Sequence, residues 1–211
     1  MEKTPVNIFL WFLGSIGAML IFLYNLKVLR KKIWKSKSIM VILGSGGHTG
    51  EILIMISKLD FKLFTDCYFV CAHNDNNSFD KAKETIIREY YPKTNFHFIK
   101  IRRSRNVGQS FISSIPTTII SLLHAFWIIL KTRPTIVVSN GPGVAVPLLF
   151  IGYFLKKCLI LSEFKILFVE SFCRTSSISL SGKIVEKICD KFIVLWKSLE
   201  GGKREYIGKI L

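Results

Sequence analysis

Paired cysteines are missing from this sequence. Its five cysteines are odd in number and form neither a disulfide framework nor a zinc-type pair of spacings. A disulfide-rich secreted scaffold and a zinc finger are therefore excluded. Because an unpaired cysteine is most often a small apolar core residue, we expect reduced and mostly buried thiols at Cys67, Cys71, Cys158, Cys173 and Cys189.

Acidic residues are also scarce. The 211 residues include 14 Asp and Glu against 30 Lys and Arg, which gives a net charge of +16 and predicts an anionic partner. Half of the residues are hydrophobic, 17 of them are phenylalanine, and the motifs typical of nucleic-acid binding are missing. This composition favours a membrane surface over nucleic acid, and the length suits one globular domain with an appendage.

Charge of either sign is absent from residues 6–26. An apolar run of this length spans a bilayer as a helix, and the six Lys and Arg residues in 27–37 are typical of the cytosolic side. A cleaved signal peptide fits less well, because the run is too long and no small-residue cleavage site follows. We predict a short N-terminus on the far side of the membrane at 1–5, a transmembrane helix at 6–26, a basic cytosolic hinge at 27–37 and a cytosolic domain at 38–211.

A second uncharged run covers residues 111–130 and contains Pro116, His124 and several Ser and Thr. If it crossed the membrane, the segments before and after it would lie on opposite sides, which would break a single α/β domain. We therefore favour a helix that is buried or contacts the membrane over a second crossing.

Short β-branched and aromatic runs alternate with longer helical patterns after the hinge. This alternation is typical of βαβ units and predicts one Rossmann-like, doubly wound parallel sheet over residues 38–211. We expect strands at 38–43, 67–72, 96–101, 135–139, 165–169 and 192–195, and helices at 51–59, 79–91, 112–130, 144–155 and 183–188.

A glycine-rich turn, residues 44–51, follows the first expected strand. Glycines let the backbone approach a ligand closely, and the N–H groups that open the next helix favour a phosphate or diphosphate. The turn is not a P-loop, because no Lys-Ser or Lys-Thr ends it; nor is it a complete dinucleotide fingerprint, because the third glycine is replaced and Asp75 is poorly placed as the acidic partner. A merely tight turn is the alternative. The residues predicted to bind diphosphate here are Gly44, Ser45, Gly46, Gly47 and Thr49.

Three more polar loops follow later strands. Ligands of open α/β sheets bind at the carboxyl ends of the strands, so we expect these loops to converge on one ligand. For the loop after the fourth strand, the alternative is that Asn140 and the glycines only start the next helix. For the loop after the fifth strand, it is a structural ion pair between Glu170 and Arg174. For the loop after the third strand, it is a solvated basic loop. The candidate residues are Asn140, Gly141 and Gly143 after the fourth strand, Glu170, Ser171 and Arg174 after the fifth, and Arg103 and Arg105 after the third.

His48 is the one histidine within a glycine-rich turn. A histidine titrates near neutral pH, and a helix N-terminus keeps the ring neutral, so His48 is a candidate general base. A hydrogen-bonding or packing role without proton transfer is the alternative. His73, His97 and His124 share no ligand spacing, so we predict no metal site.

Four motifs occur in a fixed order along the domain: 44–51, GSGGHTGE; 103–110, RSRNVGQS; 139–143, SNGPG; and 170–174, ESFCR. Together they resemble one family, the membrane-anchoring subunit of the UDP-N-acetylglucosamine transferase of asparagine-linked glycosylation. The resemblance covers residues 38–211 nearly end to end. No single motif decides it; the ordered set does.

This resemblance implies the N-terminal, acceptor-binding half of a GT-B glycosyltransferase, more distantly similar to the bacterial enzyme that makes the peptidoglycan lipid precursor. It also implies a separate cytosolic catalytic subunit that binds UDP-N-acetylglucosamine, N-acetylglucosaminyl-diphosphodolichol as acceptor, and a single-pass position in the endoplasmic reticulum membrane facing the cytosol. The implied reaction is an inverting displacement by the acceptor's 4-hydroxyl, with His48 as base, no cofactor, and no activity of this chain alone.

The C-terminal residues 206–211 become apolar again after a polar, glycine-containing stretch at 200–205, which we expect to be flexible. An apolar terminus needs its own core or a partner surface, and the resemblance favours the partner. We predict docking of the catalytic subunit through Ile207, Ile210 and Leu211, with packing on the chain's own domain as the alternative.

Two other functions remain open from the residues alone. A membrane-anchored dinucleotide-binding oxidoreductase would use the glycine-rich first turn. A non-enzymatic polybasic membrane adaptor would use only the apolar helix and the basic hinge, and would leave the glycine loops unexplained.

Overall fold

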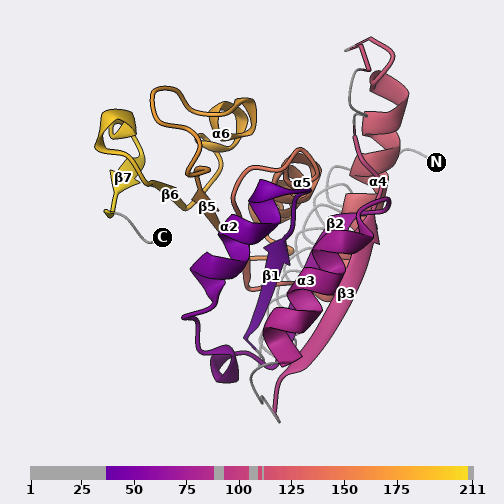
Figure 1. Ribbon diagram of the computed structural model, residues 1–211. Helices are drawn as coiled ribbons and strands as arrows, with labels where there is room; N and C mark the ends of the chain where they lie inside the picture. The colour runs from indigo at the N-terminus through magenta and orange to yellow at the C-terminus, as the bar shows by residue number, and fades with distance from the viewer. Residues whose placement is uncertain (1–36, 88–92, 105–108, 111, 209–211) are drawn as a thin grey trace, which may run out of the picture. The chain divides into compact units, whose positions relative to one another are not determined.

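The computed structural model describes residues 37–87, 93–104, 109–110 and 112–208 (Figure 1). They belong to one compact unit, Lys37–Leu211. The transmembrane helix expected at 6–26 and nearly all of the hinge lie outside the described residues, as do Arg105, Ile210 and Leu211. These parts of the sequence analysis stay predictions.

Strands and helices alternate along the described chain. The strands are β1 (Ser38–Ile42), β2 (Asp66–Ala72), β3 (Asn95–Ile101), β4 (Ile136–Ser139), β5 (Lys165–Val169), β6 (Lys191–Val194) and β7 (Arg204–Tyr206). The helices are α2 (Gly47–Ile56), α3 (Asn76–Ile87), α4 (Ile115–Thr132), α5 (Ala145–Lys157) and α6 (Leu180–Val185), with short 3-10 helices η1 (Phe61–Leu63) and η2 (Lys197–Leu199).

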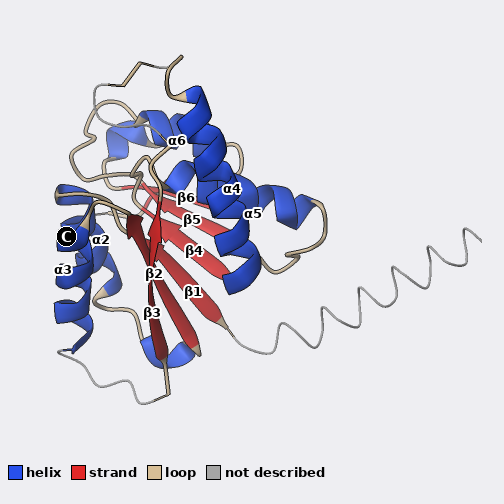
Figure 2. Ribbon diagram, turned by 90° about the vertical axis from the view of Figure 1, so that its right-hand side faces the viewer, coloured by secondary structure: helices blue, strands red, loops and turns tan. Residues whose placement is uncertain are grey.

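The strands form one parallel sheet in the order β3-β2-β1-β4-β5-β6-β7. The chain moves outward from β1 to β3, crosses back to β4 beside β1, and then moves outward to β7. Helices α2 and α3 lie on one face of the sheet and α4 and α5 on the other (Figure 2). This is the Rossmann-like, doubly wound arrangement that the sequence predicted, and its strand order reverses between β1 and β4.

The six expected strands are confirmed to within a residue or two, but a seventh was missed. Residues 200–205 were expected to be flexible, yet Arg204–Tyr206 pairs with β6 as an edge strand. Its charged side chains form ion pairs, Lys191 Nζ to Glu205 Oε2 at 3.1 Å and Arg204 Nε to Glu186 Oε1 at 3.3 Å. A three-residue polar edge strand carries no apolar alternation, so the sequence pattern could not reveal it.

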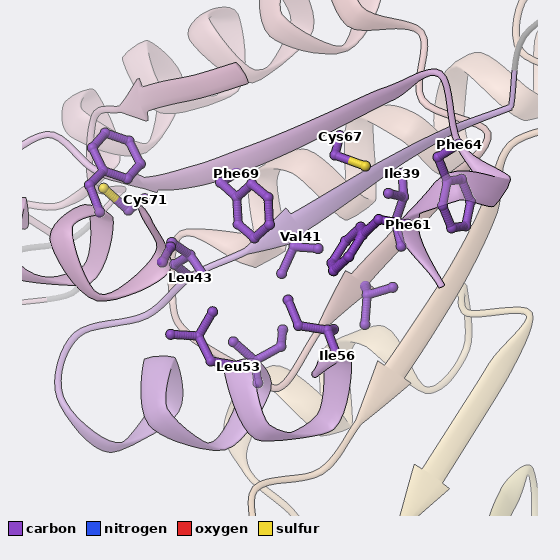
Figure 3. Packing of buried hydrophobic residues seen from close by; sticks show 14 residues of the cluster. Ile39, Val41, Leu43, Leu53, Ile56, Phe61, Phe64, Cys67, Phe69 and Cys71 are labelled. Atoms are coloured by element: carbon purple, nitrogen blue, oxygen red, sulfur yellow. The ribbon is translucent and has the colours of Figure 1, made fainter. Parts of the chain in front are cut away.

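The core between α2 and the sheet is aliphatic and aromatic. Phe69 is fully buried and lies among the rings of Phe61, Phe96 and Phe98. Figure 3 shows Phe69 with Val41 and Phe61 in this layer. Burial of these large apolar side chains is the main stabilising term of such a layer.

Three of the five cysteines, Cys67, Cys71 and Cys189, are buried and two are exposed, so the expectation of mostly buried thiols is confirmed. Burial, with a smaller contribution from the neighbouring Asp66, raises the pKa of Cys67 to about 12. Burial, with a smaller contribution from Asp75, raises the pKa of Cys71 to about 12. Both thiols therefore stay protonated near neutral pH and behave as small apolar residues.

On the other face, α5 packs close to the loop before β5. A Cβ built on Gly152 would lie 2.0 Å from Cζ of Phe164, whose side chain is fully buried. Glycine is therefore required at this position by space, and the bulk of the phenylalanine ring replaces the side chain that α5 lacks.

Helix α4 is the helix within the described residues that is long and apolar enough to cross a membrane by length and composition. However, β3 before it and β4 after it belong to the same sheet, joined through β2 and β1. One side of α4, including Ala125, Ile128 and Ile129, is buried in the domain. The shared sheet is incompatible with a crossing at α4, as the sequence analysis expected for residues 111–130.

Candidate functional site

A cavity of about 280 Å³ opens at the carboxyl edge of the sheet, where the strand order reverses. The loops after β1, β3 and β4 contribute to its wall. This is the position at which doubly wound sheets bind their ligands. The lining residues are Leu43, Gly44, Ser45, His48, Ala72, Arg103, Ser104, Gly141, Pro142, Gly143 and Val144.

The loop after β1 lies tightly against the loop after β4. A Cβ on Gly44 would lie 2.6 Å from Cβ of Pro142 and 2.8 Å from Cβ of His48, distances at which the backbone has to move. Gly46 follows with φ of +65°, a left-handed conformation that favours glycine, and α2 begins at the next residue. Space and backbone conformation thus explain two of the loop's glycines.

The first turn of α2 presents free N–H groups to the loop region. No side chain caps this helix, and its first turn carries no acidic residue. Four backbone N–H groups of a helix start lack partners within the helix, and the helix dipole adds positive potential there. With Arg103 lining the same cavity, the arrangement is suited to an anion such as a phosphate or diphosphate.

Thr49 does not reach this cavity. Its side chain is buried, its hydroxyl hydrogen-bonds to the carbonyl oxygen of Gly44, and its Oγ1 lies 2.8 Å from Oγ of Ser78. Ser78 in turn donates to Asp75 Oδ2 at 2.7 Å. The hydroxyl of Thr49 is thus engaged in holding the turn, and the expectation that Thr49 binds diphosphate stays a prediction.

Asn140 links the loop after β4 to the first turns of α2. Its side chain is fully buried, and its Nδ2 donates to the carbonyl oxygen of His48 at 2.8 Å and to Glu51 Oε2 at 3.1 Å. Its Oδ1 and the Nδ1 of His48 are buried and without a hydrogen-bond partner among the described residues. Such atoms are costly to leave unpaired, so a functional explanation is expected at this point of the fold.

Glu51 joins helix α2 to two loops, those after β4 and β5, and was not among the site residues predicted from the sequence. Its Oε2 accepts from Asn140, its Oε1 accepts from Ser171 Oγ at 2.9 Å, and Cys173 Sγ lies 3.7 Å from the same Oε1. The signal available in the sequence was spacing, since Glu51 follows His48 by three residues and so shares its helix face.

Glu170 is placed differently from the expectation. Its carboxylate is buried and accepts from Ser171 N at 3.0 Å, Ser179 N at 2.9 Å and Ser179 Oγ at 3.1 Å. Ser171 is buried and donates to Glu51, whereas Arg174 is exposed. None of Glu170, Ser171 and Arg174 lines the cavity. The loop after β5 uses the polar groups of Glu170 and Ser171 to fix its own turn, the start of α6 and the contact with Glu51, while ligand contact by the exposed Arg174 stays a prediction.

The other predicted site residues that the structure describes lie in three places. Ser45, His48 and Arg103 are brought together at the cavity with Gly44, Gly141 and Gly143. Gly46 and Gly47 are exposed at the start of α2. Ile207 follows β7, at the opposite edge of the sheet from β3, and is 43% exposed.

Neither a metal nor a dinucleotide is indicated by the described residues. No group of three or more His, Cys, Asp or Glu in the described part of the chain is arranged to hold a metal ion. The carboxylate of Asp75, the acidic candidate for a dinucleotide ribose, accepts from Ser78 N at 3.2 Å and from Ser78 Oγ. It is thus engaged at the first turn of α3.

Comparisons with known proteins found similar sequences and a similar fold. The family model described as "Oligosaccharide biosynthesis protein Alg14 like" matches residues 39–210. The "UDP-N-acetylglucosamine transferase subunit ALG14" of Candida albicans is 42% identical over 184 residues, which are 86% of this chain and 82% of that protein. The Mus musculus protein of the same name is 36% identical over 187 residues, 84% of each chain.

Among solved structures, that of Acinetobacter baumannii MurG is similar with a TM-score of 0.58 at 11% sequence identity. The match covers 81% of this chain and 45% of MurG, so the chain spans less than half of that protein. At this identity the likeness concerns the fold, and it confirms the GT-B-like, Rossmann-type class.

Proposed function

The chain belongs to the family of Alg14-like oligosaccharide biosynthesis proteins, and from that premise we propose that it is the membrane-anchoring, acceptor-binding subunit of a UDP-N-acetylglucosamine transferase. A separate cytosolic subunit would bind UDP-N-acetylglucosamine. The relatives are named as transferase subunits, and the fold corresponds to 45% of MurG. Both observations support a two-chain enzyme in which this chain supplies one of two domains.

The cavity at the strand-order reversal carries the proposal for the acceptor. It combines the uncapped start of α2 with the Arg103 guanidinium, which together favour a diphosphate. We infer that N-acetylglucosaminyl-diphosphodolichol places its diphosphate there. Its ligands would be the loop residues Gly44, Ser45, Gly46, Gly47, Gly141 and Gly143 with Arg103, while Thr49, Asn140, Glu170 and Ser171 support the loops from within the domain.

His48 is the proposed general base. It lines the cavity beside the glycine loops, within the reach of an acceptor whose diphosphate lies at the start of α2. In an inverting displacement the acceptor's 4-hydroxyl oxygen forms the new bond to the anomeric carbon, the bond to UDP breaks, and the hydroxyl proton passes to the imidazole. The product is the chitobiosyl lipid and the leaving group is UDP.

Membrane anchoring is proposed from the sequence. Residues 6–26 have the length and composition of a transmembrane helix, and the basic residues of 27–37 favour a cytosolic domain. We infer from membership of the family that this domain lies at the cytosolic face of the endoplasmic reticulum membrane, where a lipid-linked acceptor is available to it.

Reconstitution tests the function directly. The full chain is co-expressed with the donor-binding subunit, and transfer from labelled UDP-N-acetylglucosamine to a diphospholipid acceptor is measured. We expect product only when both chains are present, because each supplies one half of the active site. Transfer by the donor-binding subunit alone, at the rate measured with both chains, would contradict the proposal. Binding of a nicotinamide dinucleotide by this chain would favour the oxidoreductase function instead.

The C-terminus is the proposed docking element for the catalytic subunit. Ile207 is partly exposed immediately after the edge strand β7, so the chain leaves the sheet with an apolar residue at its surface. Deletion of Ile210 and Leu211 is expected to reduce recovery of the partner in a detergent pull-down while this chain stays folded in the membrane. Unchanged partner recovery would refute docking, and degradation of the shortened chain would point to packing on its own domain.

A further inference from the structure

The outer face of α4 carries a continuous row of exposed apolar side chains. Ile115, Ile119, Leu123 and Trp127 follow one another at a spacing of four residues and are 57%, 53%, 60% and 68% exposed. Residues four apart lie above one another on a helix, so these side chains form one stripe. The stripe spans three helical turns and continues to Lys131, which is also exposed.

The opposite side of the same helix fixes it to the domain. Ser121, Ala125 and Ile129 are fully buried, and the hydroxyl of Ser121 donates to the carbonyl oxygen of Arg102 at 3.0 Å. The helix therefore cannot turn its stripe inward, and it cannot leave the sheet to cross a membrane. The stripe is a permanent outer surface in the described part of the chain.

The neighbouring helix widens this surface. Helix α5 packs beside α4 on the same face of the sheet (Figure 2). Its Phe150 and Phe154, one helical turn apart, are 50% and 53% exposed. An apolar surface shared by two helices is unusual for a soluble face and marks an interaction site.

The α4 and α5 layer differs in charge from the α2 and α3 layer on the opposite face of the sheet. The sequence contains no Asp or Glu between Glu89 and Glu163, a stretch that includes β3, α4, β4 and α5. Lys and Arg in the same stretch number nine. The segments that build the opposite layer, from α2 to α3, contain the acidic residues Glu51, Asp60, Asp66, Asp75, Asp80 and Glu84.

We propose that the outer face of α4, with Phe150 and Phe154 of α5, lies in the interfacial zone of an anionic bilayer as a second membrane contact besides residues 6–26. Apolar side chains together with a Trp, bordered by Lys and Arg on helices that contain no acidic residue, are typical of helices that lie in a membrane interface. Anionic lipid attracts such a surface and repels the acidic one. The inference does not depend on transferase activity.

This contact orients the candidate site. Thr117 Oγ1 and Thr118 Oγ1, in the first turn of α4, donate to the carbonyl oxygen of Ser104 at 2.7 and 3.1 Å, and Ser104 lines the cavity. The N-terminal end of the stripe therefore lies beside the cavity wall. With α4 in the interface, the cavity is held next to the head-group region, where the diphosphate of a lipid resides.

Depth-dependent fluorescence quenching tests the proposal on the full chain. A variant with Trp11, Trp34 and Trp196 changed to Phe keeps Trp127 and is reconstituted into phosphatidylcholine–phosphatidylserine vesicles, with and without brominated acyl chains. We expect about a twofold or greater loss of Trp127 emission with brominated lipid. The matched control carries Trp127→Phe and Ile54→Trp, because Ile54 is 54% exposed on α2 in the opposite layer, and it is expected to show no quenching.

A second variant separates membrane contact from folding. Leu123→Glu is added to the variant that keeps Trp127 and lacks the other three tryptophans. The new charge stands at an exposed position, so the thermal unfolding midpoint is expected to stay unchanged while the quenching of Trp127 by brominated lipid is lost. Absence of quenching at Trp127, or equal quenching at Trp127 and at the Ile54→Trp control, would overturn the proposal. Protection of Trp127 from aqueous iodide only after addition of the catalytic subunit would also overturn it, because the face would then be a protein interface.

Discussion

Replacement of Gly44 by alanine is expected to lower transferase activity of the reconstituted two-chain enzyme by about 100-fold or more. The added Cβ would lie 2.6 Å from Cβ of Pro142 and 2.8 Å from Cβ of His48, atoms next to the backbone that cannot swing away. The loops after β1 and β4 must therefore separate, and a displacement of about 1 Å at reacting groups costs about this factor. The measurement is kcat/KM for the lipid acceptor.

The matched control for this substitution is Gly50→Ala in the adjoining helix α2. A Cβ on Gly50 meets nothing within 4 Å, and alanine is favoured over glycine within a helix by about 1 kcal/mol. Gly50→Ala should keep its activity and raise the thermal unfolding midpoint slightly. If Gly44→Ala retained wild-type activity, the close contact of the two loops would not be part of the active arrangement.

Substitutions of His48 and Arg103 should affect different kinetic parameters, although both residues line the same cavity. Loss of a general base acts on the chemical step, so His48→Ala is expected to reduce turnover by about 100- to 10,000-fold with saturating acceptor. Loss of a diphosphate contact acts on binding, so Arg103→Ala is expected mainly to raise the acceptor concentration required. Steady-state rates at varied acceptor concentration distinguish the two.

Two further variants complete this series. Lys58→Ala, at an exposed position just after α2, controls for loss of a surface cation and should leave both parameters unchanged. Arg174→Ala tests the position that the sequence favoured and the structure places outside the cavity lining. If Arg174→Ala raised the acceptor concentration required as much as Arg103→Ala does, the loop after β5 would be part of the binding site. Near-normal turnover of His48→Ala at saturating acceptor would reassign His48 to positioning.

Local chemistry made much of the fold predictable. β-Branched and aromatic runs such as residues 38–43 and 165–169 are bounded by glycine or polar turns, and each proved to be a strand. Helix starts were harder to place. Helix α2 begins at Gly47, within the glycine loop, and α3 begins at Asn76, next to Asp75, whose carboxylate accepts the N–H of Ser78. The first turn of a helix carries no apolar periodicity, so the sequence pattern does not mark where it begins.

By itself, the sequence determined the fold class, the family, the glycine loops at two strand ends and the apolar run at 6–26, because these follow from periodicity, turn chemistry and an ordered set of motifs. The tertiary structure alone decided which loops share a cavity. Arg103 reaches it from β3 while Arg174 does not, and Glu51 links loops that are 89 and 120 residues away in sequence.

The same division applies to α4 and β7. Apolar length left open whether residues 111–130 cross a membrane, and the placement of β3 and β4 in one sheet answers it. Strand β7 is defined by its pairing with β6, and its side chains form ion pairs with Lys191 and Glu186. Strand order and side-chain pairing are long-range properties, so they depend on contacts between segments that no local pattern in the sequence records.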